Sequence, residues 1–275
     1  MNQTKGMNRN TIDKFYTKPD IVDACIPFIK HHLQLGQNDL VIEPSAGNGA
    51  FIPAIKSLSC HNIFYDIEPD NNSEILKQDY LTICHEEFSG KFNAIHIIGN
   101  PPFGRQSSLA IKFIKKSCEF CDSISFILPK SFKKDSLKKV FPLYFHLVFE
   151  DDIPDKSFLV NNKEHDVPCV FQIWKKMPVK RVVLEKKEPE HFVFVEKTDG
   201  ADISFRRVGV NAGKIDTNIE EKSIQSHYFI RFTNNKSVDE NISLLSVINY
   251  EFNNTVGPKS ISKQELIDKF NPLLG

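Results

Sequence analysis

The sequence has no long hydrophobic run and no excess of charge of one sign. Nowhere do 18 consecutive apolar residues occur, which excludes a membrane-spanning helix and a membrane partner of that kind. Residues 1–10 are polar and lack the apolar core of a signal peptide. We therefore expect an intracellular, soluble protein, in either cytoplasm or nucleus. Because 35 basic residues balance 35 acidic ones, any surface that binds a nucleic acid must be a local patch.

The cysteines and histidines also lack the spacings that mark disulfide frameworks and metal sites. The six cysteines are scattered through apolar stretches, where a thiol acts as a small hydrophobic group. Cys118 and Cys121 form a single C-x-x-C, and a tetrahedral zinc site needs two more ligands at matching spacing, which we do not find. We therefore predict no metal site.

The order of hydrophobic patterns predicts two domains. A chain of 275 residues has room for one large α/β domain and a smaller region. Short apolar runs alternate with helical patterns up to residue 178, which is the order of a parallel sheet with crossover helices. Strands are expected at residues 40–43, 62–67, 94–98, 123–128, 145–150 and 168–174, and helices at residues 21–29, 50–58 and 109–120.

Residues 179–275 have a different pattern of charged and β-prone residues, which predicts a smaller α+β region. Charged, β-prone segments at residues 181–186, 191–196, 203–210 and 228–232 are separated by turn signals. Ser262 and Glu265 form a capping box that opens a short helix, and Asn271-Pro272 should end it.

The first motif with chemical content is Glu43-Pro-Ser-Ala-Gly47-Asn-Gly49, between a predicted strand and a predicted helix. Its glycines allow positive φ and a close approach of a ligand at the carboxyl end of the strand. The motif lacks the third glycine of the dinucleotide fingerprint and the Gly-Lys-Ser/Thr of a phosphate loop, so neither NAD nor ATP is the natural ligand. On its own, a glycine-rich turn without a ligand explains it equally well.

Acidic residues downstream favour a nucleoside ligand. Asp66 ends the second predicted strand, about twenty residues after the glycines, where a carboxylate can accept both ribose hydroxyls. Glu68 is the competing candidate. Asp79 precedes a turn, and its carboxylate can accept from an adenine amino group. Three acids in this order after one glycine loop indicate an adenosine-containing ligand.

The most specific motif is Asn100-Pro101-Pro102-Phe103, directly after a buried strand. The two prolines stiffen the backbone and hold Asn100 in an extended conformation. The Asn100 side-chain carbonyl and the Pro101 main-chain carbonyl are two acceptors for the hydrogens of one exocyclic amine. Such bonds draw the nitrogen lone pair out of conjugation and aim it at an electrophile. Phe103 offers a face on which a base can stack.

These motifs together resemble the amino-methyltransferases, the class I enzymes dependent on S-adenosylmethionine (SAM) that methylate the exocyclic amine of adenine. The resemblance covers roughly residues 13–176, and the motif order is similar to the gamma arrangement of DNA adenine methyltransferases. It implies a Rossmann-like class I methyltransferase sheet with helices on both faces. The residues that carry the resemblance are Phe15-Tyr16-Thr17-Lys18-Pro19, the glycine loop, Asp66, Asp79 and Asn100 to Phe103.

The resemblance also implies roles for single residues. Thr17 and Pro19 would line the methionine end of SAM, Glu43 and Gly47 would bracket its amino and carboxylate groups, Asp66 would hold its ribose and Asp79 its adenine. Asn100, Pro101, Pro102 and Phe103 are the predicted catalytic motif. The predicted cofactor-binding residues are Tyr16, Thr17, Pro19, Glu43, Pro44, Ser45, Ala46, Gly47, Gly49, Asp66, Ile67, Asp79, Tyr80 and Asn100.

The implied reaction is methyl transfer from SAM to the N6 amine of adenine, and four substrate or role alternatives stay open. The sequence motifs Phe-Tyr-Thr-x-Pro and Glu-Pro-Ser-Ala-Gly favour a DNA substrate. Asn-Pro-Pro-Phe is also similar to the motif of adenine methyltransferases acting on ribosomal, small nuclear or capped messenger RNA. A protein glutamine amide has the same planar shape. The fourth alternative is a non-catalytic SAM-fold subunit that works with a protein partner.

Two basic features suit a nucleic acid. Lys130, Lys133, Lys134 and Lys138 recur at helical spacing beside the predicted catalytic edge, although a solvated helix face explains them equally well. In the region from residue 179 onward, cations are mixed with hydroxyls, a composition suited to phosphate contacts. The predicted substrate-binding residues are Phe103, Lys130, Lys133, Arg206, Arg207, Lys259 and Ser260.

Overall fold

The computed structural model divides the chain into two compact units, residues 1–182 and 183–275. It describes residues 15–59, 61–70, 72–160, 162–183, 185–252 and 258–275. Within these ranges, no helix combines the length and the apolar character that crossing a membrane requires.

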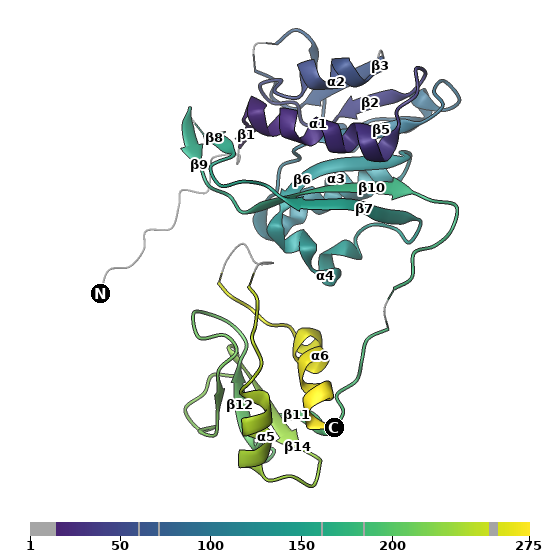
Figure 1. The fold of residues 1–275 in the computed structure, drawn as a ribbon. Helices are drawn as coiled ribbons and strands as arrows, with labels where there is room; N and C mark the ends of the chain where they lie inside the picture. The colour runs from purple at the N-terminus through teal and green to yellow at the C-terminus, as the bar shows by residue number, and fades with distance from the viewer. Residues whose placement is uncertain (1–14, 60, 71, 161, 184, 253–257) are drawn as a thin grey trace. The chain divides into compact units, whose positions relative to one another are not determined.

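A seven-stranded sheet forms the centre of the first unit (Figure 1). The strand order is β4-β3-β2-β5-β6-β10-β7. β10 runs in the opposite direction to the other six strands of this sheet, antiparallel to both β6 and β7. The order reverses between β2 and β5, and open α/β sheets bind ligands at the carboxyl edge of such a switch point. The strands are β2 (Leu40–Glu43), β3 (His61–Asp66), β4 (Ile75–Lys77), β5 (Ile95–Gly99), β6 (Ser123–Pro129), β7 (Phe145–Asp152) and β10 (Cys169–Lys176).

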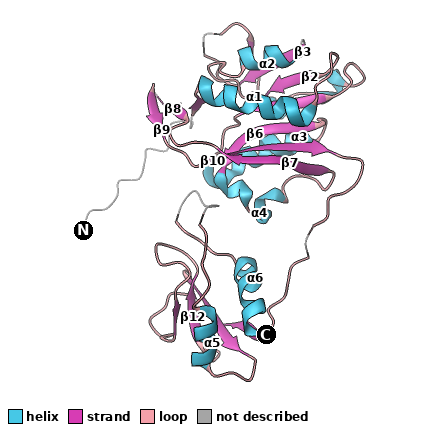
Figure 2. Ribbon diagram, viewed as in Figure 1, coloured by secondary structure: helices cyan, strands magenta, loops and turns pink. Residues whose placement is uncertain are grey.

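Helices cover both faces of this sheet (Figure 2). α1 (Pro19–Leu33) and α2 (Ile52–Leu58) pack on one face, and α3 (Ser108–Cys118) packs on the other. α1 begins with a proline, which suits the first helical position, and buries one apolar stripe from Ile21 to Leu33. The predicted Rossmann-like class I methyltransferase fold is therefore confirmed. The shorter helical turns are η1 (Tyr80–Thr82), η2 (His85–Phe88), η3 (Arg105–Ser107), η4 (Lys130–Lys133) and α4 (Asp135–Lys138).

A small second sheet of the first unit was not predicted. It joins β1 (Tyr16–Thr17) to the hairpin of β8 (Phe158–Val160) and β9 (Lys163–His165). Tyr16 pairs with Leu159 and Thr17 with Phe158, whose side chain is fully buried. The hairpin lies between the strands predicted at residues 145–150 and 168–174, where no strand was expected. The pairing fixes β1 against the body of the unit.

The second unit is built on a four-stranded antiparallel sheet covered by two helices. Its strand order is β11-β14-β12-β13. The ring of Phe270 on α6 lies 5.4 Å from that of Phe192 and 5.8 Å from that of Phe205, measured between centroids. The elements are β11 (Phe192–Val195), β12 (Ile203–Arg206), β13 (Ile215–Asp216), β14 (His227–Phe232), α5 (Val238–Leu245) and α6 (Lys263–Leu274).

The prediction that Asn271-Pro272 ends the last helix is wrong. The capping box of Ser262 and Glu265 starts α6 as predicted, but the helix continues through Pro272 to Leu274. The Asn271 amide nitrogen donates to the Glu188 carbonyl at 2.9 Å, and its carbonyl oxygen accepts from the Glu190 N–H at 3.0 Å. These contacts hold the last turn in place despite the proline.

The prediction of a strand at residues 181–186 is also wrong, because Arg181 has a different partner. Its guanidinium donates to four backbone carbonyls, those of residues 138, 141, 142 and 145, at 2.7–3.1 Å. It also lies over the ring of Trp174, 5.4 Å from the centroid. Arg181 is thereby tied to the first unit, which ends at residue 182.

A buried polar network lies at the amino edge of the large sheet. His96 on β5 contacts the Ser123 hydroxyl through Nδ1 at 2.7 Å and the Asp39 carboxylate through Nε2 at 3.2 Å. All three residues are buried. Burial lowers the pKa of His96 below its ordinary value of 6.5, although the Asp39 carboxylate acts in the opposite direction. The ring is therefore neutral at pH 7, with Nε2–H donating to Asp39.

We predict that replacing His96 with Phe destabilises the first unit in a pH-dependent way. The substitution leaves the buried Ser123 hydroxyl without this partner and removes one hydrogen bond from Asp39 Oδ2, which keeps the Gly36 N–H at 2.6 Å. The loss costs about 1–3 kcal/mol at pH 7.5. Below pH 6.5 the unfolded wild-type chain binds a proton that folded His96 does not, so wild-type stability falls as the pH drops toward the folded pKa. The difference between wild type and His96→Phe should therefore shrink at pH 5.

The measurement is urea unfolding followed by the fluorescence of Trp174, the only tryptophan of the chain, which is buried in the first unit. A stability difference that stays constant from pH 7.5 to pH 5 would contradict a neutral buried ring.

Candidate functional site

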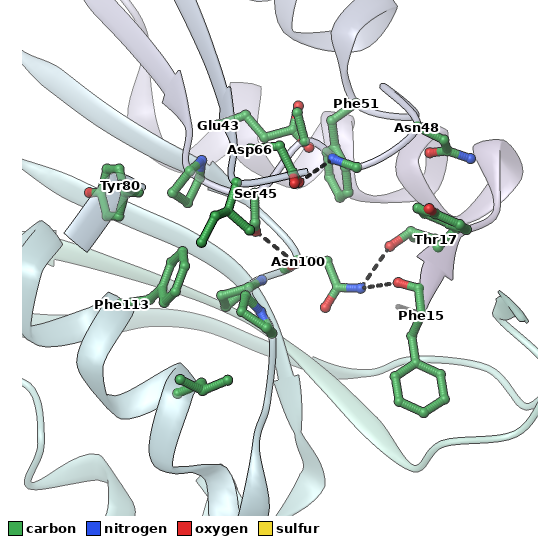
Figure 3. Close-up of a pocket in the computed structure, with 18 of the residues that line it drawn as sticks. Phe15, Thr17, Glu43, Ser45, Asn48, Phe51, Asp66, Tyr80, Asn100 and Phe113 are labelled. Atoms are coloured by element: carbon green, nitrogen blue, oxygen red, sulfur yellow. Dashed lines mark hydrogen bonds between the residues drawn. The ribbon is translucent and has the colours of Figure 1, made fainter. Parts of the chain in front are cut away.

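A cavity of about 360 Å³ opens at the switch point of the large sheet, where β2, β3 and β5 end (Figure 3). It collects most of the residues that the sequence analysis assigned to the cofactor and the target base. Those that line it are Tyr16, Thr17, Glu43, Pro44, Ser45, Ala46, Gly47, Asp66, Ile67, Asp79, Tyr80, Asn100, Pro101, Pro102 and Phe103.

Two residues predicted for the cofactor do not line the cavity. Pro19 is the exposed first residue of α1. Gly49 has a φ of +83°, and a Cβ atom there would come within 2.8 Å of the Asn72 side chain. Its role is to let the loop turn into α2 rather than to face a ligand.

Further lining residues were not assigned to the site from the sequence. The sequence contains a pattern that could have identified two of them. Leu109 and Phe113 are one turn apart on a predicted helix that follows the Asn-Pro-Pro-Phe motif. Phe15 and Asn48 stand inside the motifs Phe15–Pro19 and Glu43–Gly49, where they were given no role, and the others carry no distinctive pattern. The full set is Phe15, Asn48, Ala50, Phe51, Gln78, Leu81, Leu109 and Phe113.

Asp66 holds the glycine loop in shape. One of its carboxylate oxygens accepts the N–H of Gly47 and the other the N–H of Glu68, each at 2.8 Å. The N–H of Ala46 donates to the carbonyl of Tyr65, also at 2.8 Å. The carboxylate therefore lines the cavity while it fixes the backbone of the loop, and each of its oxygens retains capacity to accept another hydrogen bond.

The backbone conformation and the space at position 47 both require a glycine. Its φ is +54°, and a Cβ atom there would lie 2.9 Å from the ring of Tyr16. The Tyr16 hydroxyl donates to Asp70 Oδ1 at 3.2 Å. The tyrosine thus packs directly on the glycine loop, which leaves no room for a side chain.

Glu43 is a buried acid with an unsatisfied atom. Its side chain is 1% exposed, and Oε2 has no hydrogen-bond partner among the described residues. Burial, together with the nearby charge of Asp66, raises the pKa of this carboxyl well above its usual range. A cation or a hydrogen-bond donor bound in the cavity would compensate this buried group.

Asp79 and Tyr80 form a turn at the far side of the cavity. The Asp79 carboxylate accepts the N–H of Leu81 at 2.9 Å and caps η1. The hydroxyl of Tyr80 lies 2.8 Å from that of Ser117, and its ring stacks on Phe113 with centroids 5.5 Å apart. Asp79 therefore contributes a carboxylate to the cavity, whereas Tyr80 contributes the wall.

The amide of Asn100 is fixed in one orientation (Figure 3). Its nitrogen donates to the Phe15 carbonyl at 3.2 Å and to the Thr17 hydroxyl at 3.1 Å. A carbonyl can only accept, so the Phe15 contact identifies which side of the amide carries the nitrogen. The opposite atom, Oδ1, is buried and has no partner among the described residues. The cavity therefore contains a preoriented and unused acceptor.

The loop after Asn100 is anchored on both sides. The Asn100 carbonyl accepts from the Ser45 hydroxyl at 3.1 Å, and the Phe103 carbonyl accepts from the N–H groups of Leu109 and Ala110 at 3.1 and 3.3 Å. Phe103 is half-buried and lines the cavity. This loop joins the glycine loop to the start of α3.

The predicted basic helix beside the site does not form as one helix. η4 and α4 are two short turns, and the lysines pair with acids at the end of β7. Lys130 and Lys133 lie 2.9 and 2.6 Å from Asp152, and Lys138 lies 3.2 Å from Glu150. Burial acts to raise the pKa of Asp152, but the hydrogen bonds from Lys133 and Lys130 outweigh it and lower that pKa. All three of these lysines are thus paired within the protein, Lys130 and Lys133 sharing the single carboxylate of Asp152.

The other predicted basic residues lie in the second unit and do not join this cavity. Arg207 donates to the Gln225 carbonyl at 2.9 Å and lies 5.5 Å from the centroid of the Tyr228 ring. Lys259 lies over Phe252, and Ser260 forms an isolated β-bridge with Val208. Arg206 lines a separate cavity.

Comparison with known proteins gives a family and several distant structural relatives. The model of the EDM2 methyltransferase-like domain matches residues 39–184, more than half of the chain. Protein ENHANCED DOWNY MILDEW 2 of Arabidopsis thaliana is 25% identical over 166 residues, which cover 57% of this chain but only 12% of the plant protein.

Two solved structures illustrate the structural likeness. The 23S rRNA methyltransferase ErmE has a TM-score of 0.45 at 13% identity, covering 61% of this chain and 71% of its own. A type I restriction-modification methyltransferase subunit from Streptococcus thermophilus has a TM-score of 0.44 at 13% identity, covering 60% and 46%.

The residues of the cavity fit the cofactor of a class I methyltransferase, which is SAM. The cavity has an unsatisfied buried acid, an open glycine loop and a carboxylate at the end of β3. The narrower resemblance to adenine-N6 amino-methyltransferases stays a prediction. The chain belongs to the EDM2 methyltransferase-like domain family.

Proposed function

We propose that this chain transfers the methyl group of SAM to the exocyclic N6 amine of adenine in DNA. The observation that carries the proposal is the fixed amide of Asn100, whose buried Oδ1 has no partner among the residues that the structure describes. An acceptor oriented in this way is suited to an amine hydrogen of a planar substrate. The Pro101 carbonyl follows directly in the chain and would take the second hydrogen.

The residues that would hold SAM surround the glycine loop. Asp66 would accept the ribose hydroxyls with the remaining lone pairs of its carboxylate, and Asp79 would accept from the adenine amine. Glu43 would face the ammonium group of the methionine part, which would favour the ionised form of this buried carboxyl. SAM supplies a methyl group activated by a positively charged sulfur.

The residues of the Asn-Pro-Pro-Phe loop would prepare the amine. Hydrogen bonds from both amine hydrogens to Asn100 and Pro101 localise the lone pair on nitrogen, and the rigid loop aligns it for transfer. Phe103 would stack on the base, a contact of about 1–3 kcal/mol. We propose DNA rather than RNA as the substrate because of the Phe-Tyr-Thr-x-Pro motif and the order of the motifs along the chain.

The test is methyl transfer from labelled SAM to matched duplex DNA, single-stranded DNA, structured RNA and a glutamine-containing peptide, with SAM binding measured by calorimetry. Digestion and mass spectrometry identify the modified nucleoside or residue. N6-methyladenine in DNA supports the proposal. Methyladenosine in RNA alone would move the substrate to RNA. Transfer to a glutamine-containing peptide alone would overturn the nucleic-acid assignment. SAM binding without transfer to any of these would favour a non-catalytic subunit.

Thr17→Val is predicted to lower kcat about tenfold while SAM affinity changes little. The substitution keeps the shape of this buried side chain but removes the hydroxyl that accepts from the Asn100 amide. The amide is then held only by the Phe15 carbonyl, and a loosely oriented acceptor aligns the amine less well. Thr17 is thus a positioning residue in this view.

The control is Thr17→Ser, which keeps the hydroxyl and should restore most of kcat. The measurements are SAM binding by calorimetry and single-turnover methyl transfer. A large rise of the SAM dissociation constant with unchanged kcat would instead place Thr17 at the methionine end of SAM, as the sequence resemblance implies.

A further inference from the structure

A second cavity, of about 190 Å³, lies entirely within the second unit. Arg206 ends β12, Asp216 ends β13 and His227 begins β14, and these residues meet on one side of the sheet. The remaining lining residues come from the loops at 207–214 and 217–226. The complete lining is Arg206, Asn211, Lys214, Asp216, Lys222 and His227.

This cavity lies on the face of the sheet opposite to α6. Phe205 and Tyr228 are paired across β12 and β14, and Phe205 packs on Phe270 of α6. The next pair along the same strands is Arg206 and His227. Because side chains alternate along a strand, this pair faces away from α6.

The charges that line the cavity leave a positive balance. Asp216 is the only acid among the described residues that line it, and Lys222 pairs with one of its carboxylate oxygens at 2.7 Å. The other oxygen accepts the N–H of Asn218 at 2.9 Å. The charge of Asp216 is thus compensated by Lys222, and the charges of Arg206 and Lys214 remain.

Several polar groups of this cavity lack a hydrogen-bond partner among the described residues. Arg206 donates through Nε to the Val208 carbonyl at 2.8 Å and through Nη1 to Ser226 at 3.3 Å, which leaves Nη2. The Lys214 amino group has no acceptor within hydrogen-bond distance. The ring of His227 is only 9% exposed and is held through Nδ1 by Ser223 and Ser226, while Nε2 has no partner. Lys214 is exposed and Arg206 is half-buried, so both cations present donors that no described residue occupies, beside a nearly buried histidine, and this arrangement indicates a site for an anionic ligand.

We propose that this cavity binds a backbone phosphate of the nucleic-acid substrate. A guanidinium, an ammonium and an amide surround this polar hollow, and groups of these kinds donate hydrogen bonds to phosphate oxygens. The inference rests on the proposed function for the identity of the polyanion. The two loops that line the hollow also carry exposed apolar residues, Val210 at 88% and Ile224 at 68% exposure, which would contact the adjoining sugar or base.

Two residues predicted from the sequence to bind nucleic acid border the same loop. The Gly209 N–H donates to the Lys259 carbonyl at 2.9 Å, and Ser260 is bridged to Val208. The loop that carries Asn211 and Lys214 is therefore held by backbone contacts against the segment of Lys259 and Ser260.

The decisive variant is Lys214→Gln, because this amino group makes no hydrogen bond that the fold depends on. Its matched control is Lys269→Gln, which removes the same charge from an exposed position on α6. The full chain is titrated with fluorescently labelled single-stranded DNA and RNA at several salt concentrations. We expect about fivefold weaker binding for Lys214→Gln and a salt slope smaller by about 0.7, the value for one phosphate contact on a single strand. Lys269→Gln should bind like wild type.

Three outcomes would overturn the inference. Equal losses for both variants would show a general charge effect. Binding of inorganic phosphate or adenosine monophosphate that weakens in Lys214→Gln, with unchanged oligonucleotide binding, would show a site for a free phosphate compound. Binding of a glutamate-rich peptide that weakens in the same way would show an acidic protein partner.

The inference and the proposed function can fail separately. If the wild type methylates a nucleic acid but Lys214→Gln binds oligonucleotides normally, the phosphate site is wrong and the function stands. If no substrate is methylated but Lys214→Gln still loses oligonucleotide affinity against its control, the site stands as an anion site and the function is wrong.

Discussion

Asn100→Ala should lower methyl transfer by about 10²–10³-fold, the range found when one oriented transition-state hydrogen bond is removed from an active site, while SAM binding changes little. The substitution deletes Oδ1, a buried acceptor of the cavity that has no partner among the described residues. The contacts of the Asn100 backbone, including the bond from the Ser45 hydroxyl, remain. The measurement is single-turnover transfer at saturating SAM, with SAM affinity determined separately by calorimetry.

The same cavity offers a matched control. Asn48 also lines it, but its Oδ1 already accepts the N–H of Ala50 at 3.3 Å. Asn48→Ala should therefore leave the rate within about threefold of wild type. Near-normal turnover by Asn100→Ala, or an equal loss in both variants, would remove the basis for assigning Asn100 to the reacting amine.

The fold could be predicted where an uninterrupted run of apolar residues indicates a buried element. The strand Leu40–Glu43 is buried at every residue, as expected for a central parallel strand, and the glycine loop follows it directly. The capping box that predicted α6 from Ser262 and Glu265 also occurs at Ser237 and Glu240. The helix α5 was therefore within reach of the same reasoning, although it was not identified.

Features that depend on distant partners could not be predicted. The exposed sequence Lys163–His165 forms a strand only because β8 also pairs with β1. The lysines at 130 and 133 have the spacing of a solvated helix face, but the presence of Asp152 at the end of β7 decides what they contact. Likewise, the sequence placed Asn100 at a strand end, but only the contacts with β1 fix its amide.

Asp66→Ala should have the largest effect on SAM affinity, raising the dissociation constant about 100-fold. The variant loses the proposed ribose acceptor and also leaves the N–H groups of Gly47 and Glu68 without their acceptor. Two charge-assisted hydrogen bonds that shape the loop are lost at once, at about 1.5–3 kcal/mol for each bond to a charged group. Trp174 fluorescence would verify that the first unit stays folded.

Two companion variants separate the roles of this carboxylate. Asp66→Asn keeps one carbonyl oxygen for the backbone but replaces the other with a donor, so its SAM affinity should fall between those of wild type and Asp66→Ala. Glu68→Ala removes the neighbouring acid and leaves both backbone contacts of Asp66 intact, so SAM should bind nearly as in wild type. A larger loss in Glu68→Ala than in Asp66→Ala would identify Glu68 as the ribose ligand and limit Asp66 to shaping the loop.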